Sequence, residues 1–257
     1  MGWPYQQKPP IGWPIDWDEP INQGLVGYYP MLVGSGNTVN NLSRNAGAST
    51  IVGAEWNVGS GGSCLLFDSQ NDYINTSVSL TTRNFTIICC YDEGNTENFC
   101  LWQAQEGAGA PYKYALLEMQ TDDDLTLYTG DGTNYDALII SDAVGVGNWN
   151  KKNTVAITID GAGLAKGYVN GVLKGQDTLV EVETTWTLRL GSDEYIPAKM
   201  KCFYYLVYNR ALSASEIALL YREPFCMFKD PAEIALLAAY TAGAPPGIPI
   251  FRRRRAG

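Results

Sequence analysis

Acidic side chains come closer to a catalytic spacing than any other residues in this sequence. A retaining glycosidase needs two carboxyl groups about 5 Å apart. Asp122, Asp123 and Asp124 are consecutive, so they cannot share one face of a strand, and a solvated turn suits them better. Glu181 and Glu183 alternate, but no third acid follows in step. The sequence therefore predicts no catalytic residues and no enzyme.

Histidine is absent from the 257 residues, which removes further chemistry. Without it the chain lacks the commonest general base, the usual partner of nucleophilic serine or cysteine, and the commonest zinc ligand. The six cysteines show no C-x-x-C spacing, and Cys89 and Cys90 are neighbours inside an apolar run. We predict reduced cysteines that serve as small core residues, rather than a catalytic or metal-binding thiol.

Aromatic side chains offer a different chemistry, because an exposed ring can stack on a sugar. Core or sheet-face packing is the alternative for each of these rings. The candidates for glycan contact are Trp102, Tyr128, Tyr135 and Trp149.

The composition indicates a β protein with many turns. Charged residues make up 18% and aromatic residues 12% of the chain, which also contains 27 glycines. The formal net charge of −9 disfavours nucleic acid as a partner. The N-terminus lacks the apolar region of a secretory signal, and no run has the length of a membrane span.

Short strand-like runs separated by glycine-rich turns fill the middle of the chain. No helix is predicted before Ser213, which forms a capping box with Glu216. Ile217, Leu220 and Tyr221 then fall on one face of a short helix. The pattern predicts an all-β, antiparallel two-sheet sandwich or jelly roll. The runs are residues 24–30, 64–67, 85–91, 112–119, 125–130, 137–141, 154–160, 166–171, 186–191 and 201–208.

Residues 1–22 are predicted to form an extended arm. Five prolines exclude a helix and a central strand there, while Trp3, Trp13 and Trp17 are too apolar for a solvated linker. The arm either packs on its own domain or lies along a neighbouring subunit with its indoles as anchors. We favour the neighbouring subunit, because the other end of the chain carries a second candidate docking segment.

That second segment is a tail over residues 223–257. Asp230, Pro231 and Glu233 are typical of a helix start, and residues 232–243 are apolar nearly all round. Such a helix needs cover on more than one side, from its own sheet or from a partner. An arginine cluster then offers bidentate bonds to carboxylates. The predicted partner-binding residues of the tail are Ile234, Leu236, Leu237, Tyr240, Arg252, Arg253, Arg254 and Arg255.

Three stretches in the middle of the chain resemble the laminin-G-like, concanavalin A-like jelly-roll family. GLVGYYPMLVGSGNTVNNLSRNAG is similar to the family's opening segment, and LLFDSQNDYI to its F-D-G-x-D-D-Y strand pair. YVNGVLKG, LRLGSDE and YNRALSASEIALLY are similar to its closing strands and terminal helix. The resemblance covers about residues 24–222 and implies a concanavalin A-like jelly roll over residues 23–222, with short helices after it. Lectins, glucanases, adhesion modules and virion proteins share this fold, so it does not decide function.

The resemblance also implies a possible calcium site at one rim, at Asp68, Asn71 and Asp72. Asn71 replaces an acid of the family's motif, and Phe203-Tyr204 stands where the family usually carries an acidic pair. Turn formation is the alternative for these side chains. We therefore predict no metal and no cofactor. The family's glucanases carry an E-x-D-x-E run on one strand, which this chain lacks.

These observations leave two functional hypotheses. The first is a structural virion protein, a decoration of a viral or bacteriophage capsid or part of a fibre, anchored to other virion subunits or to its own copies through both termini. It would be a homo-oligomer located in the virion. The alternative is a non-catalytic carbohydrate-binding module, a lectin or adhesion domain for extracellular or cell-surface glycans. Both roles are compatible with one jelly roll.

Overall fold

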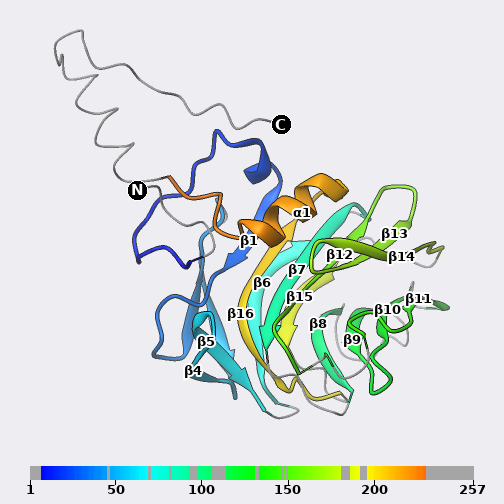
Figure 1. The fold of residues 1–257 in the computed structure, drawn as a ribbon, viewed down its shortest axis with the longest axis horizontal. Coiled ribbons are helices and arrows are strands. Elements are labelled where there is room, and N and C mark those ends of the chain that lie inside the picture. Colours follow the sequence, from blue (N-terminus) through cyan, green and yellow to red (C-terminus); the bar gives the residue numbers. More distant parts are fainter. Residues whose placement is uncertain are drawn as a thin grey trace, which may run out of the picture.

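The structure is a computed structural model that contains two antiparallel β-sheets packed face to face (Figure 1). This confirms the predicted jelly-roll sandwich. No helix in the described part of the chain is long and apolar enough to cross a bilayer. The structure describes residues 7–44, 47–68, 71–80, 83–92, 98–105, 114–130, 133–145, 148, 150–180, 186–191 and 196–229.

Sheet 1 has β16 near its middle, because this long apolar strand pairs with β1, β5 and β7. The strand order is β14-β13-β12-β7-β16-β5-β4, with β1 also on β16. The strands of sheet 1 are β1 (Leu25–Tyr29), β4 (Glu55–Gly59), β5 (Gly62–Phe67), β7 (Phe85–Asp92), β12 (Asn153–Ile159), β13 (Leu164–Val169), β14 (Val172–Thr178) and β16 (Met200–Tyr208).

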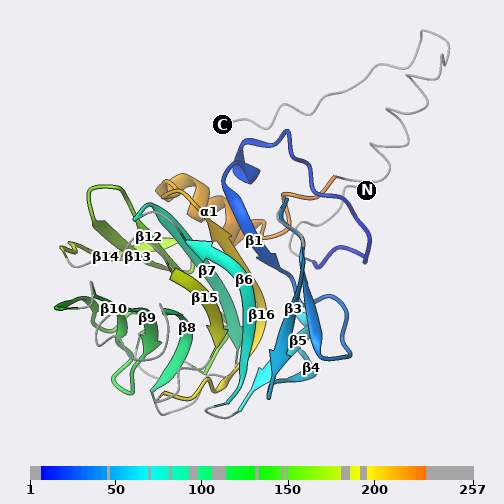
Figure 2. The ribbon, with the colours of Figure 1, turned by 180° about the vertical axis from the view of Figure 1, so that it is seen from behind.

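Sheet 2 lies against sheet 1 and has the strand order β11-β10-β9-β8-β15-β6-β3-β2. Figure 2 shows β10, β9, β8, β15 and β6 in succession across this sheet. Its strands are β2 (Thr38–Asn41), β3 (Gly47–Val52), β6 (Tyr73–Leu80), β8 (Phe99–Gln105), β9 (Tyr114–Met119), β10 (Leu125–Gly130), β11 (Tyr135–Ile140) and β15 (Trp186–Gly191).

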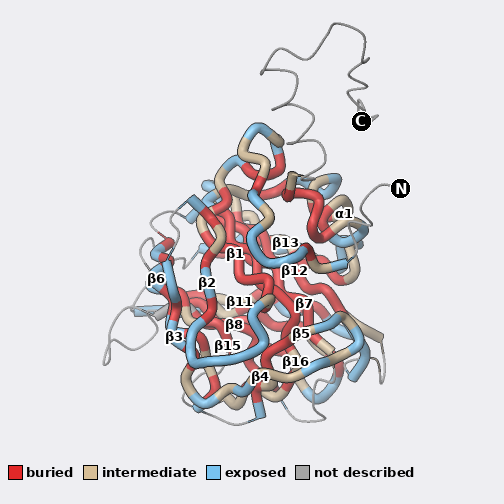
Figure 3. Tube along the Cα trace, turned by 90° about the vertical axis from the view of Figure 1, so that its left-hand side faces the viewer, coloured by how far each residue is buried: buried red, intermediate tan, exposed pale blue. Residues whose placement is uncertain are grey.

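The main core fills the space between the two sheets, and alternation along each strand sends every second side chain into it. Figure 3 shows the buried residues along the middle of the body and the exposed residues toward its rim. On β7 the two neighbouring cysteines separate as predicted. Cys89 packs in this main core, whereas Cys90 packs in a second cluster on the outer face of sheet 1.

The second cluster exists because the outer face of sheet 1 is covered by three segments of the same chain. These are the arm, the helix α1 (Ala214–Arg222) and the residues that follow α1. Ile15 and Ile21 of the arm are buried against the sheet, and Trp13 and Trp17 are partly buried there. The described part of the arm thus packs on its own domain. Partner binding by Trp13 and Trp17 stays a prediction, as do the domain boundaries after residues 22 and 222.

The arm and the segment after α1 bind each other directly. Ile15 and Phe228 form an isolated antiparallel β-bridge. Asp16 N donates to Met227 O at 2.7 Å, and Lys229 N donates to Pro14 O at 2.9 Å. An ion pair between Lys229 Nζ and Asp16 Oδ1, at 3.0 Å, lies beside these bonds. We call this pairing of residues 14–16 with residues 227–229 the terminal clasp.

Lys8 anchors the start of the described arm. Its Nζ donates to the backbone oxygens of Met31, at 3.1 Å, and of Ser63, and it lies 5.6 Å from the centroid of the Phe203 ring. Burial disfavours the charged ammonium, so the pKa of Lys8 falls to about 8.

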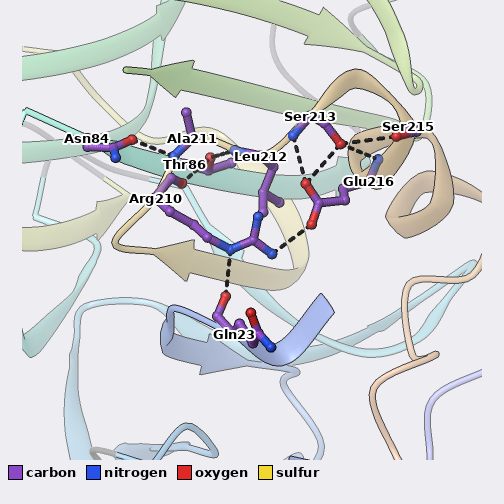
Figure 4. A network of polar contacts seen from close by, with 9 residues as sticks. All are labelled: Gln23, Asn84, Thr86, Arg210, Ala211, Leu212, Ser213, Ser215 and Glu216. Atoms are coloured by element: carbon purple, nitrogen blue, oxygen red, sulfur yellow. Dashed lines mark hydrogen bonds and ion pairs between the residues drawn. The ribbon is translucent and has the colours of Figure 1, made fainter. Parts of the chain in front are cut away.

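Arg210 joins the end of β16 to Gln23, the residue that follows the arm, and to α1 (Figure 4). Its Nε donates to Gln23 O, and its Nη2 donates to Glu216 Oε1, each at 2.7 Å. Ser213 and Glu216 form the capping box that the sequence predicts. Burial is the largest single influence on the pKa of Glu216 and raises it, but the hydrogen bonds with Arg210 and Ser213 and the charge of Arg210 together outweigh burial and lower the pKa. Ile217 and Leu220 are buried, but Tyr221 is 44% exposed, so the predicted apolar face is narrower than expected.

All six cysteines are free and buried, as predicted. Burial raises the pKa of the Cys90 thiol from 9.0 to about 11. Burial is also the main cause that raises the pKa of Cys202. An unfolded chain would lose these protons near pH 9, whereas the folded chain keeps them to higher pH.

We therefore expect these two thiols to leave the free energy of unfolding unchanged below pH 9 and to lower it between pH 9 and 11. Two pKa units at Cys90 correspond to about 3 kcal/mol. Urea unfolding under reducing conditions at several pH values measures this effect as the difference between the unmodified chain and Cys90→Ala, because the lowered pKa of Lys8 changes the free energy of unfolding in the opposite direction over this pH range. Cys90→Ala should be less stable at pH 7 but should show a shallower decline, and an unchanged slope would contradict the assignment.

Candidate functional site on the outer face of sheet 2

The register of sheet 2 assigns each strand residue to one of its faces. A row of cross-strand neighbours on the inner face runs through seven strands, and every member is buried in the main core. Because paired residues share a face, this row identifies the inner side of the sheet. Its members are Ile51, Ile74, Leu190, Trp102, Leu117, Leu127 and Leu138.

The adjacent row of cross-strand neighbours lies on the outer face of the same seven strands. At about 4.8 Å per strand, it extends for about 29 Å. Its members, from β3 to β11, are Thr50, Asn75, Arg189, Gln103, Leu116, Tyr128 and Ala137. We call this set the outer row.

Tyr128 is the centre of a polar group at one end of the outer row. Gln120 Nε2 donates to Tyr128 Oη at 3.1 Å and also to Glu118 Oε1 at 2.5 Å. Glu118 pairs with Thr126 on β10, so it shares the outer face with Tyr128, and it is buried at 3% exposure. Desolvation and the charge of Glu118 raise the pKa of Tyr128. The phenol ring and the Gln120 amide of this group are half-buried, whereas the Glu118 carboxylate is buried.

Tyr135 lies beside this group at the edge of the sheet. It pairs with Gly130, two residues from Tyr128 on β10, so both tyrosines share the outer face. Diagonal neighbours of this kind are about 7–8 Å apart. Tyr135 is 58% exposed and Tyr128 is half-buried. Together with Glu118 and Gln120 they form what we call the Tyr128 cluster, which can stack on a flat apolar ring and exchange hydrogen bonds with hydroxyl groups.

Arg189 provides a cation further along the outer row. Its guanidinium lies 4.3 Å from the centroid of the Tyr73 ring. Asn75 and Gln103 are its cross-strand neighbours on the two sides. The 4.3 Å distance to the Tyr73 ring is within the range of a cation–π contact, which holds the Arg189 side chain on the outer face.

The four aromatic candidates for glycan contact have different outcomes. Tyr128 and Tyr135 lie together on the outer face. Trp102 is fully buried in the main core, with its ring edge-on to Phe85 at 6.3 Å, so its prediction as a sugar-stacking residue is wrong. A bulge between Cys100 and Trp102 shifts the register of β8 and β9 there, which the sequence did not reveal. Trp149 lies outside the described residues.

Several predicted partner-binding residues also lie outside the described part of the chain. They are Trp3, Ile234, Leu236, Leu237, Tyr240, Arg252, Arg253, Arg254 and Arg255.

The calcium candidates lie at the turn between β5 and β6. Asp72 is buried and its Oδ2 accepts from Asp68 N at 2.7 Å, which is turn formation. Gly53, at φ +74°, packs so closely that a Cβ there would lie 2.6 Å from Asn71 O. No group of three or more acid, cysteine or histidine side chains in the described residues could hold a metal. Calcium binding at Asp68, Asn71 and Asp72 is not tested by these contacts, and the absence of a metal or cofactor stays a prediction.

The consecutive acids also form a turn. Asp123 has φ +67°, and Asp124 Oδ1 accepts from Asp142 N at 2.9 Å, so this carboxylate joins the turn between β9 and β10 to the segment that follows β11. Glu181 and Glu183 lie outside the described residues.

Sequence reasoning missed Glu118, Gln120, Tyr73 and Arg189. A usable signal was present in β9, where Ala115, Leu117 and Met119 face the core and Glu118 stands between two of them. Alternation alone predicts that such an acid faces outward. The sequence of one strand does not show which residues of the neighbouring strands it pairs with. The positions of Tyr128 and Gln103 beside β9 therefore could not be predicted.

A family model for the concanavalin A-like lectin/glucanases superfamily matches residues 68–218, more than half of the chain. The chain belongs to this superfamily. Its match begins at the β5–β6 turn and ends within α1, so it includes the Tyr128 cluster and Arg189. None of the curated proteins compared with the sequence matches it.

Solved structures with the concanavalin A-like fold align with most of the chain. The botulinum neurotoxin serotype D binding domain is 18% identical with a TM-score of 0.61, over 79% of this chain and 52% of that one. The ligand binding domain of the same serotype, in complex with N-acetylneuraminic acid, is 17% identical with a TM-score of 0.56, over 78% and 51%. This chain therefore spans about half the length of these toxin domains.

A third similar structure is domain 4 of AbnA, an extracellular GH43 arabinanase from Geobacillus stearothermophilus, in complex with arabinotriose. It is 16% identical with a TM-score of 0.58, and the alignment covers 77% of this chain and 98% of that one. At these identities the likeness shows a shared fold.

Proposed function

We propose that this chain is a non-catalytic carbohydrate-binding module whose ligand lies on the outer face of sheet 2. The observation that carries the proposal is the Tyr128 cluster. It places two tyrosine rings, a carboxylate and an amide on one sheet face, with Gln120 bonded to both Glu118 and Tyr128. Rings that stack and fixed groups that exchange hydrogen bonds are what recognition of a sugar requires.

The comparisons support this choice over other uses of the fold. Two of the similar structures are complexes with a sugar, N-acetylneuraminic acid in one and arabinotriose in the other. A toxin binding domain and a domain of an extracellular enzyme act outside the cell that makes them. We accordingly propose an extracellular or cell-surface place of action for this chain.

Tyr128→Ala tests the proposal. A glycan array with the full chain first identifies a ligand, and titration calorimetry then compares the variants. Loss of a central aromatic contact typically costs more than about 1.4 kcal/mol, so we expect affinity to fall at least about tenfold. Tyr128→Phe should keep most of the affinity, because the ring remains and only the hydroxyl that accepts from Gln120 is lost.

Tyr221→Ala is the matched control, since Tyr221 is an exposed tyrosine on α1, away from sheet 2. Its affinity should equal that of the unmodified chain. Equal affinities for Tyr128→Ala and Tyr221→Ala would place the ligand elsewhere. A chain that binds no glycan on the array would refute the proposed function.

The virion role remains a second hypothesis, and it has less support from the structure than from the sequence alone. One of its arguments was a free arm, but Trp13 and Trp17 pack on the protein's own sheet 1. Its other argument, the apolar and arginine-rich tail, concerns residues 230–257, which lie outside the described chain. Virion location, assembly through the termini and homo-oligomer formation stay predictions.

A further inference from the structure

The strand β11 carries an exposed part of the outer face of sheet 2, at the margin of the body (Figure 1). Tyr135, Ala137 and Ile139 alternate along β11 with residues of the main core, so all three lie on the outer face. Tyr135 is 58% and Ile139 60% exposed, whereas further along the outer row Leu116 and Gln103 are buried. A ligand at the Tyr128 cluster therefore meets β11 rather than the middle of the sheet.

Ala137 is a low point among larger side chains. It pairs directly with the half-buried Tyr128 on β10. Tyr135 and Ile139 stand two residues before and after it on β11, so each is a diagonal neighbour of Tyr128, about 7–8 Å away. Because the side chain of Ala137 is a single methyl group, the other three side chains rise around it. We call Tyr128, Tyr135, Ala137 and Ile139 the β11 patch.

The β11 patch fits a small apolar group better than a protein partner. A standard protein interface uses about 20–30 residues a side, whereas Tyr135 and Ile139 are the exposed large apolar side chains of the described strands of sheet 2. A hydroxyl group placed over Ala137, beside Ile139, would give up hydrogen bonds to water without replacement from these side chains. A methyl group gives up none and gains contact with the surrounding side chains.

We propose that the ligand of this module is a sugar with a methyl-bearing substituent, an acetyl or a deoxy group, that lies over Ala137 between Tyr135 and Ile139. The ring of the same sugar stacks at Tyr128. Ala137 and Tyr128 are cross-strand partners, with Cβ atoms about 5 Å apart, so one sugar residue reaches both. This inference rests on the proposed function and adds the chemical class of the sugar.

Two matched pairs of probes test the inference, measured by calorimetry with the full chain. The acetyl pair is chitotriose and cellotriose, which share a backbone and differ by an acetamido group in place of a hydroxyl on each ring. The deoxy pair is methyl α-L-rhamnoside and methyl α-L-mannoside, which differ by a methyl in place of a hydroxymethyl group. In at least one pair we expect the methyl-bearing probe to bind about fourfold more tightly, as burial of one methyl group predicts. The pair that shows the preference distinguishes acetyl from deoxy.

Ile139→Ser removes one side of the β11 patch and should reduce this preference to less than about twofold. Because Ile139 is largely exposed, the variant should keep the Tm of the unmodified chain, which a thermal scan checks. Ala137→Leu fills the low point and should weaken binding of the methyl-bearing probe more than binding of its partner. Val58→Ser is the matched control, since Val58 is an exposed β-branched residue on β4, the edge strand of sheet 1, and its preference should stay intact.

The inference is overturned if the probes of each pair bind equally, if Ile139→Ser keeps the preference, or if the array identifies only ligands without acetyl or deoxy groups. An acetylated or deoxy ligand from the array, with its hydroxyl counterpart, replaces the probes if neither pair binds. A full chain that forms a dimer which Ile139→Ser dissociates would assign the patch to a second copy and also overturn the inference. These results would leave the proposed function standing, whereas a chain that binds no glycan of any kind refutes the proposed function instead.

Discussion

Trp102→Ala is expected to lower the free energy of unfolding by about 3–5 kcal/mol, the range for removal of a buried aromatic side chain. Trp102 is fully buried at the centre of the inner row, between Leu190 and Leu117, and contacts the Phe85 ring. The alanine would leave a large cavity between the sheets. For a chain of this length the loss corresponds to a decrease in Tm of roughly 6–20 °C, which calorimetry measures.

Trp102→Phe separates packing from ligand contact. In the described part of the structure, Trp102 Nε1 has no hydrogen-bond partner, so phenylalanine removes volume and no bond. We expect a smaller loss of stability and unchanged glycan affinity at a temperature where the variant is folded. Lost affinity with unchanged stability would mean that Trp102 contacts the ligand after all.

Deletion of residues 1–22 is expected to yield a protein that aggregates or unfolds. The arm covers an apolar surface on sheet 1 that includes Tyr28, Phe203 and Leu206, all nearly fully buried in the intact chain. A monomer rarely tolerates an exposed apolar patch of this kind. Size-exclusion chromatography with light scattering and a thermal scan would compare the truncated and full chains.

Lys229→Ala is the control for that deletion, because it removes only the ion pairs of Lys229 with Asp16 and Asp18. Exposed pairs contribute at most about 1 kcal/mol, so this variant should remain a stable monomer. A truncated chain that is monomeric and as stable as the full chain would show that the arm does not protect sheet 1.

The sequence was most informative where local chemistry is strong. The strand β16 is a long apolar run, and Ser213 with Glu216 forms a capping box that depends on four consecutive residues. The adjacent cysteines of β7 separate to opposite faces because alternation is a local rule. The order of the family-like motifs along the chain indicated the two-sheet architecture, which no single segment specifies.

Several strands with polar outward faces are absent from the strand-like runs that the sequence indicates, and so is the largely buried β8. β6 alternates buried residues with exposed Asn75, Ser77 and Ser79, and β14 is exposed nearly throughout. Both read as turn-like sequences because serine, threonine, asparagine and glycine also favour turns. Their partners in the sheets, not their own propensities, hold them extended.

The candidate site depends on contacts between distant segments, which limits what a sequence shows. Tyr128 and Tyr135 were identified as aromatic candidates, but their common face follows from the pairing of β10 with β11. The position of Arg189 follows from its pairing with β6 and β8, which come from elsewhere in the chain. Trp102 was misassigned because a β-bulge places it in the core.

The position of β16 has a consequence for how the chain acquires its fold during synthesis. This strand is among the last parts of the body to leave the ribosome, yet it separates β5 from β7 and also pairs with β1, near the start. Until it emerges, three earlier strands lack a neighbour and their apolar faces lack cover. Such long-range pairing makes folding slow and exposes the nascent chain to aggregation. The protein is therefore expected to fold after translation of β16, in one late step, and to benefit from chaperones until then.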